Sequence, residues 1–203
     1  MIFDFLRSGG KPEYIVACLG NPGREYEASR HNAGFRAGDY ICERLGVKAD
    51  RLKFQSLTAI SDVEGKKILI LKPQTFMNNS GVAVSEAAGF YKIPPQNIIV
   101  ICDDISLSPG NIRVKRKGSD GGQRGLRSII GCMGSEDIQR IKIGVGDREN
   151  RDIDLADWVL GKPSQSDADA ISARCPDVFS ALCLIISGKT EDAMNLYNKG
   201  ATL

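Results

Sequence analysis

One imidazole stands out in this 203-residue sequence, because His31 is the only histidine in the chain. A free imidazole has a pKa of about 6.5, which makes it the side chain best suited to accept a proton near neutral pH. The alternative is that His31 is an ordinary surface or helix-capping residue. Asp103 favours the chemical interpretation, because a carboxylate beside one ring nitrogen would fix the tautomer and stabilise the protonated ring.

Three polar residues come shortly after short apolar segments rich in Val and Ile, and these segments predict buried strands. They are Asn21, Asn78 and Asp103. In open α/β sheets, ligands bind beyond the carboxyl ends of the strands. We therefore expect the three side chains to face one crevice, on the same rim as His31.

Direct attack by an activated water molecule fits this sequence better than a protein nucleophile. No serine lies in the G-x-S-x-G turn that presents the nucleophile of many serine hydrolases. A cysteine hydrolase using Cys102 and His31 is an alternative. However, Cys102 adjoins Asp103 in the chain, and alternation along a strand should turn it into the core.

The composition gives little support to a metal or an organic cofactor. The six cysteines form no C-x-x-C pair, and a zinc site would also need more than one histidine. The glycine-rich segment GSDGGQRG at 118–125 lacks the Gly-Lys-Ser/Thr ending of a phosphate-binding P-loop. It could still offer backbone amides to an anion, or form a plain tight turn. We expect no metal and no cofactor.

Positive charge is concentrated in residues 113–127, which carry six basic residues and one acidic residue in a chain of net charge +2. Arg113 and Lys115 share one face of a predicted strand, and Lys142 comes from another strand. Cations that converge near the end of a sheet would suit a phosphate group. The alternative is a solvated charged strand and loop.

The elements that must position these residues alternate between strands and helices. Strands are predicted at 14–19, 67–71, 97–102 and 140–145, and an antiparallel edge could add 53–60. Helical spacing follows at 33–45, 80–91 and 126–130, and again beyond Pro163 through residue 199. This order predicts an α/β fold with a twisted, mostly parallel mixed sheet, helices on both faces and a C-terminal helical cap.

The length and the hydrophobic content of 42% suit one domain, which we place at 14–203. Residues 1–13 are then an N-terminal extension that we expect to be disordered. No apolar segment is long enough to cross a bilayer, and the first residues mix charge, Gly and Pro, unlike a signal peptide. We expect a cytoplasmic protein that does not bind membranes.

Three long segments closely resemble bacterial-type peptidyl-tRNA hydrolases: LGNPGREYEASRHNAGF at 19–35, LKPQTFMNNSG at 71–81 and CDDISLSPG at 102–110. The resemblance continues through GSDGGQRGL, RIKIGVG and WVLGKP, and covers roughly residues 14–200. It implies a single α/β domain without metal or organic cofactor. It also implies hydrolysis of the ester that joins a peptide to the terminal ribose of tRNA, by a protein that we expect to be a monomer.

The resemblance also implies roles for the matching residues. His31 would accept a proton from water, Asp103 would be its stabilising partner, and Asn21 would distinguish blocked from free aminoacyl groups. The residues implied to hold the peptide and the terminal nucleotide are Tyr26, Phe76 and Asn78. The residues implied to bind tRNA phosphate are Arg113, Lys115 and Lys142.

One segment departs from the family pattern, which usually reads Gly-Gly-His-Asn-Gly where this chain has GGQRG at 121–125. Arg124 therefore replaces a substrate-positioning Asn, and an Arg has only donors and a permanent charge. Our hypothesis is that Arg124 contacts the tRNA backbone. The rival interpretation is a catalytically weak, RNA-binding relative of the family, against which the presence of His31 and Asp103 argues.

Overall fold

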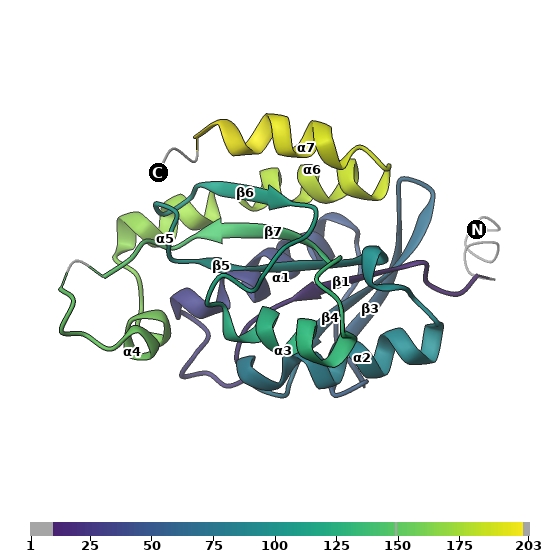
Figure 1. Ribbon diagram of the computed structural model, residues 1–203, viewed down its shortest axis with the longest axis horizontal. Helices are drawn as coiled ribbons and strands as arrows, with labels where there is room; N and C mark the ends of the chain where they lie inside the picture. The colour runs from purple at the N-terminus through teal and green to yellow at the C-terminus, as the bar shows by residue number, and fades with distance from the viewer. Residues whose placement is uncertain (1–9, 149, 201–203) are drawn as a thin grey trace.

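A seven-stranded mixed sheet forms the centre of the computed structural model, which describes residues 10–148 and 150–200 (Figure 1). The strands lie in the order β2-β3-β4-β1-β5-β7-β6. Their bounds are β1 Tyr14–Cys18, β2 Arg51–Lys53, β3 Ser56–Val63, β4 Lys66–Pro73, β5 Ile98–Asp104, β6 Ile112–Lys115 and β7 Gln139–Gly144. The four central strands are parallel, and β2, β3 and β6 add antiparallel edges. The predicted mostly parallel sheet is confirmed.

Helices cover both faces of the sheet, as predicted. They are α1 Ala33–Arg44, α2 Ser80–Tyr91, α3 Arg124–Met133, α4 Leu155–Leu160, α5 Gln165–Ser172, α6 Cys175–Ile186 and α7 Thr190–Tyr197. One apolar core lies between the sheet and α2 and α3, and the other lies between the sheet and α1, α6 and α7 (Figure 1). The sequence predicts helices only beyond Pro163, so the short α4 is an addition to the predicted fold. It begins at Leu155, where the Asp154 carboxylate accepts a hydrogen bond from the Ala156 backbone N–H at 2.7 Å.

Strand β5 explains how neighbouring residues come to face different environments. All seven of its residues are buried, as expected for a central strand covered on both faces. Ile99 and Ile101 pack in the core beneath α1 and α6, whereas Val100 and Cys102 pack in the core beneath α2 and α3. The expected core position of Cys102 is therefore confirmed. Asp103 comes one residue later in the strand, so its side chain faces the other way.

The start of α1 approaches the sheet so closely that it requires a glycine. A Cβ atom at Gly34 would lie 2.4 Å from the carbonyl oxygen of Ile101 and 2.5 Å from that of Leu19. The Phe35 backbone N–H donates to the Leu19 carbonyl at 3.0 Å, which ties the helix to the end of β1. This approach places the residues just before α1, including His31, at the carboxyl edge of the sheet.

Most of the predicted N-terminal extension, residues 1–9, lies outside the described part of the chain. Pro12 is buried, and the Glu13 backbone N–H donates to the Lys67 carbonyl at 2.8 Å, so these two residues contact the sheet. Across residues 10–148 and 150–200, no helix combines the length and the apolar character needed to span a membrane.

Replacement of Gly34 by alanine should destabilise the fold. The added methyl group would meet backbone atoms of Ile101 in β5 and of Leu19 just after β1, and such overpacking costs about 1–3 kcal/mol. Gly89 is the matched control, because it lies exposed in α2 with no atom within 4 Å of an added Cβ. Gly89→Ala should raise the free energy of unfolding by about 0.5–1 kcal/mol. Denaturant unfolding measures both, and equal stability of the two variants would contradict this account of the α1 contact.

Candidate active site

A cavity of about 410 Å³ lies beyond the carboxyl ends of β1, β4 and β5. Its size falls in the range of small-ligand sites. It is lined by every predicted site residue except Arg113 and Lys115, namely Asn21, Tyr26, His31, Phe76, Asn78, Asp103, Arg124 and Lys142. The prediction that the polar residues at the strand ends face one crevice is confirmed.

His31 and Asp103 meet at the base of this cavity. His31 belongs to the 3-10 helix η1 (Arg30–Asn32), immediately before α1, and Asp103 lies near the end of β5. His31 Nδ1 lies 2.9 Å from Asp103 Oδ1, and the two residues are 7% and 2% exposed. In this ring orientation the Nδ1–H is not aligned for a hydrogen bond. Catalytic contacts commonly tighten only when substrate binds. Because Nδ1 faces the carboxylate, Nε2 is the nitrogen that remains to accept a proton.

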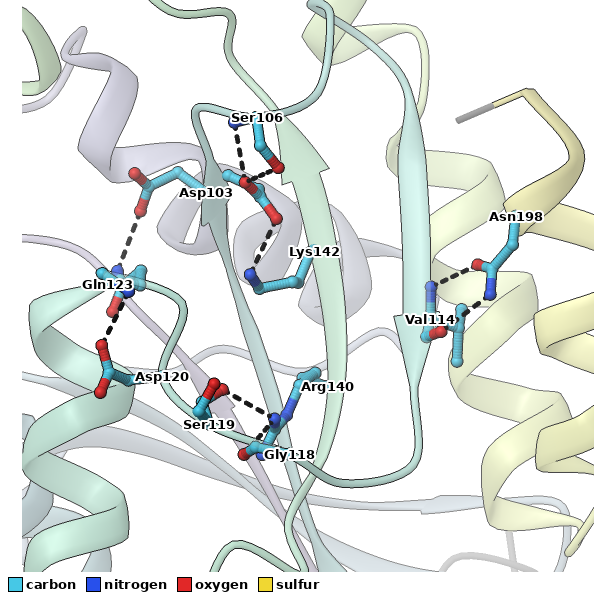
Figure 2. Close-up of polar contacts among 12 residues, drawn as sticks. Asp103, Ser106, Val114, Gly118, Ser119, Asp120, Gln123, Arg140, Lys142 and Asn198 are labelled. Carbon is cyan, nitrogen blue, oxygen red and sulfur yellow. Dashed lines mark hydrogen bonds and ion pairs between the residues drawn. The ribbon is translucent and has the colours of Figure 1, made fainter. Parts of the chain in front are cut away.

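Gln123 is a second neighbour of the same carboxylate. Its Nε2 donates to Asp103 Oδ1 at 3.0 Å (Figure 2). Its Oε1 accepts from the Leu126 backbone N–H at 2.7 Å. Gln123 is therefore both the N-cap of α3 and a partner of Asp103. The sequence analysis identified its position only as a departure from the family pattern. No charge or periodicity in the sequence marks a neutral amide as part of a site.

The amide of Asn21 is held in one orientation. Its Oδ1 accepts from the Met77 backbone N–H at 2.8 Å. The backbone of Asn21 is fixed in turn by Asn32, whose Oδ1 accepts from the Asn21 N–H at 2.8 Å and whose Nδ2 donates to the Asn21 carbonyl at 3.0 Å. Since Met77 occupies the oxygen end of the Asn21 side chain, its NH₂ group is the end available to a ligand.

Two aromatic residues form part of the cavity wall. Tyr26 and Phe76 make an edge-to-face contact, with ring centroids 6.2 Å apart. Phe76 has a φ of 57°, in the left-handed region that bulky residues rarely adopt, and the residue is 51% exposed. Strained backbone of this kind gathers at ligand sites, where the surrounding structure holds it in place.

The predicted basic cluster is brought together by the pairing of β6 with β7. Arg113 lies opposite Lys142, and Lys115 lies opposite Arg140. Lys142 is only 5% exposed, and its Nζ lies 2.8 Å from Asp104 Oδ2. Burial alone would raise the pKa of Asp104, but the hydrogen bond and the charge of Lys142 hold that pKa below its usual value.

The pKa of Lys115 reflects the same concentration of positive charge. Its pKa is lowered by partial burial and then by the positive charges of Lys142 and Arg113. Bound phosphate would relieve this repulsion, so the face of β6 and β7 that carries these side chains favours an anion. Arg140 has a different role, since its guanidinium donates to the Gly118 and Ser119 carbonyls at 2.6 and 3.2 Å and holds the loop after β6 (Figure 2).

The peptidyl-tRNA hydrolase family model matches residues 15–202. The chain belongs to this family. A peptidyl-tRNA hydrolase of Thermoanaerobacter sp. (strain X514) is 45% identical over 185 residues, which cover 91% of this chain and 99% of that protein. The corresponding protein of Agathobacter rectalis is 42% identical over 186 residues, which cover 91% of this chain and all of that protein. The crystal structure of peptidyl-tRNA hydrolase from Acinetobacter baumannii has a TM-score of 0.86 and 31% identity, and covers 95% of this chain and 98% of that one.

One wall of the cavity was not predicted from the sequence. It is formed by α4 and the residue before it: Asp154, Leu155, Ala156, Val159 and Leu160. Arg30, next to His31, holds the end of this helix by donating to the Lys162 carbonyl at 2.9 Å and by stacking 3.6 Å from the Trp158 ring centroid. Asp154 before an apolar residue is an N-cap signal that could have marked the helix.

Metal-binding geometry is not found in the part of the chain that the structure describes. Within residues 10–148 and 150–200, no three His, Cys, Asp or Glu side chains are grouped so that they could hold a metal ion. The residues that line the cavity instead supply an imidazole, carboxylates, amides and cations. These groups can move a proton, hold a carbonyl oxygen and attract an anion.

The cysteine alternative gives a test of the site. Burial raises the pKa of Cys102 to about 12, so its thiolate is not available near neutral pH, whereas Cys132 is exposed on α3. Brief treatment of the native protein with an alkylating reagent should label Cys132 and leave Cys102 unmodified. Mass spectrometry locates the label. Modification of Cys102 in the folded protein, together with loss of hydrolysis, would support the cysteine mechanism instead.

Proposed function

We propose that this chain hydrolyses the ester bond of peptidyl-tRNA by direct attack of a water molecule, with His31 as the general base. The observation that carries the proposal is the 2.9 Å contact between His31 Nδ1 and Asp103 Oδ1 at the base of the cavity. Membership of the family indicates the substrate, and this pair of side chains indicates how water is activated. The two side chains come from remote parts of the sequence, and the ring contacts the carboxylate through Nδ1, which leaves Nε2 for the proton of water.

Each step of the reaction can be assigned to this pair. His31 Nε2 removes a proton from water as the water oxygen bonds to the ester carbonyl carbon. Asp103 stabilises the positive charge that the ring acquires, and keeps the proton of the neutral ring on Nδ1. When the tetrahedral intermediate collapses, the bond to the ribose oxygen breaks and His31 returns the proton to that oxygen. The products are a free peptide carboxylate and a tRNA with a free terminal hydroxyl.

Asn21 can select the substrate because only its NH₂ end is available. This donor can bond to a carbonyl oxygen, either as negative charge develops on the ester or on the acyl group of a blocked amine. A free aminoacyl group presents an ammonium, which is also a donor and therefore makes no favourable contact with NH₂. An uncharged, acylated nitrogen is thus preferred, and aminoacyl-tRNA is spared.

The aromatic wall and the neighbouring amide hold the rest of the substrate. Tyr26 and Phe76 present ring faces and edges on which the terminal base of the tRNA can stack, a contact that tolerates any base. Asn78 is exposed at the same wall and offers both a donor and an acceptor to the peptide.

The tRNA backbone binds along β6 and β7 in this proposal. Arg113 and Lys115 supply charge at the surface, and Lys142 adds to it from the cavity wall. Since Lys142 already pairs with Asp104, its share in phosphate binding is smaller than that of the two β6 residues. Phosphate contacts of this kind position the nucleic acid without reading its sequence.

The proposal places the chain in the cytoplasm as a monomer that acts on a nucleic-acid substrate and not at membranes. The rival interpretation is a catalytically weak RNA-binding relative, in which the altered loop at 121–125 is retained for binding alone. His31 and Asp103 remain in contact beside that loop, and Gln123 within it bonds to Asp103. The related proteins named above are peptidyl-tRNA hydrolases.

Replacement of His31 by alanine should abolish cleavage of an N-acetylated aminoacyl-tRNA. Loss of a general base typically lowers the rate by about 10²- to 10⁴-fold. Release of radiolabelled acyl amino acid measures the rate, and the free aminoacyl-tRNA is the control substrate, which neither protein should cleave. Filter binding should show unchanged affinity for tRNA. Full activity of His31→Ala would refute the assignment of the base.

Replacement of Arg124 by asparagine should weaken the dependence of activity on salt. If Arg124 contacts a phosphate, the slope of log kcat/KM against log salt concentration should fall by about 1. Arg127→Asn is the matched control, because it removes an equal charge from the same helix at an exposed position paired with Asp120, outside the cavity. An equal change in the two variants would show that Arg124 acts only through net charge.

A further inference from the structure

Gln123 joins the first turn of α3 to the pair of residues at the base of the cavity. Its Oε1 accepts from the Leu126 N–H at 2.7 Å. Its Nε2 donates to Asp103 Oδ1 at 3.0 Å (Figure 2). The same nitrogen lies 3.2 Å from Met77 Sδ. The residue is 7% exposed, so water competes little for these contacts. One side chain thus connects a helix terminus to the carboxylate.

The helix terminus fixes which end of the amide faces Asp103. If the amide turned over, Nε2 would face the Leu126 N–H and Oε1 would face the carboxylate, and both contacts would be repulsive. The observed orientation is therefore the one in which a donor faces Asp103. The backbone of α3 determines it, and no change of protonation is needed.

The oxygen that Gln123 holds is the one that faces the imidazole. Asp103 Oδ1 lies 3.0 Å from Gln123 Nε2 and 2.9 Å from His31 Nδ1. A carboxylate that is free to turn about its χ2 torsion changes the distance of this oxygen from the ring. A bond from a fixed donor limits that rotation.

We propose that Gln123 is a positioning residue for the His31–Asp103 pair, which it serves by holding Asp103 Oδ1 against the ring. This role rests on the proposed function of that pair. Gln123 acts through Asp103 and need not touch the substrate. Its donor also shares the negative charge of the carboxylate, so the charge that the imidazole experiences depends on it.

The other charged groups around the pair come from five parts of the chain. Asp104 on β5 pairs with Lys142 on β7, Arg124 lies at the start of α3, Asp154 precedes α4, and Arg30 bonds to the backbone at the end of α4. A substitution of Gln123 removes none of them. A change in which ring nitrogen of His31 carries the proton on such a substitution would therefore report the lost contact with Asp103.

Two variants separate the positioning role from the capping role. Asparagine is a favoured N-cap residue and keeps an amide, but its shorter side chain does not reach Asp103. Leucine can neither cap the helix nor donate. If Gln123 positions Asp103, Gln123→Asn and Gln123→Leu should both lower kcat about tenfold and change KM less than about twofold. If Gln123 only caps α3, Gln123→Asn should match the wild type.

NMR gives a readout that capping alone would not change. Because His31 is the only histidine, its ring nitrogen signals can be assigned without ambiguity. If Gln123 holds Asp103 Oδ1 against the ring, loss of its donor frees the carboxylate to turn, so the preference of the neutral ring for a proton on Nδ1 should weaken in both variants. Thermal unfolding shows whether each variant is folded.

Three outcomes are decisive. Lower kcat and a weaker preference for a proton on Nδ1 in Gln123→Asn support the proposal. A wild-type kcat and a wild-type proton position in that variant overturn it, even if Gln123→Leu is impaired or unfolded. If the wild-type protein itself does not cleave N-acetylated aminoacyl-tRNA, the proposed function fails, and the NMR measurement, which needs no substrate, still decides whether Gln123 holds Asp103.

Discussion

The short contact between His31 and Asp103 depends on how β1 and β5 pair. Their parallel register, with Ala17 opposite Val100, brings the carboxyl ends of both strands to one edge of the sheet. A shift of β5 by one residue would turn Asp103 to the opposite face, away from the ring. Gly34 then lets α1 approach this edge closely enough to bring its preceding turn over the carboxylate. The chemistry of the site is thus set by strand register and one close backbone approach.

Buried amides hold the polar groups of the site, and each is fixed by backbone of another segment. The Met77 N–H holds Asn21, Asn32 bonds to the backbone of Asn21, and the Leu126 N–H holds Gln123. Inside a protein such groups are costly unless they are satisfied, so each of these hydrogen bonds favours one orientation of its amide. Before substrate binds, the NH₂ group of Asn21 is therefore left for the ligand, and the NH₂ group of Gln123 faces the Asp103 carboxylate. This preorganisation is what a water-activating site requires.

The sequence was most informative where residue type and strand position agree. His31 and Asp103 could be predicted to meet because parallel strands share a carboxyl edge and because an imidazole and a carboxylate have known chemistry. The pairing of Lys142 with Asp104 could not be predicted, since it depends on the register of β7 against β5. Gln123 was missed as a partner because a neutral amide has many roles, and only the structure shows which atoms it faces. Helix α4 was too short to give a periodic signal.

The position of the proton on the neutral His31 ring tests the central claim most directly. Nitrogen NMR of protein labelled in histidine reports which ring nitrogen carries the proton, and the single histidine makes the assignment unambiguous. Contact of Nδ1 with Asp103 predicts a proton on Nδ1 and an unprotonated Nε2 above the titration midpoint, with loss of this preference in Asp103→Ala. A neutral ring protonated on Nε2 in the wild-type protein would contradict the account, because that nitrogen could not then accept a proton from water.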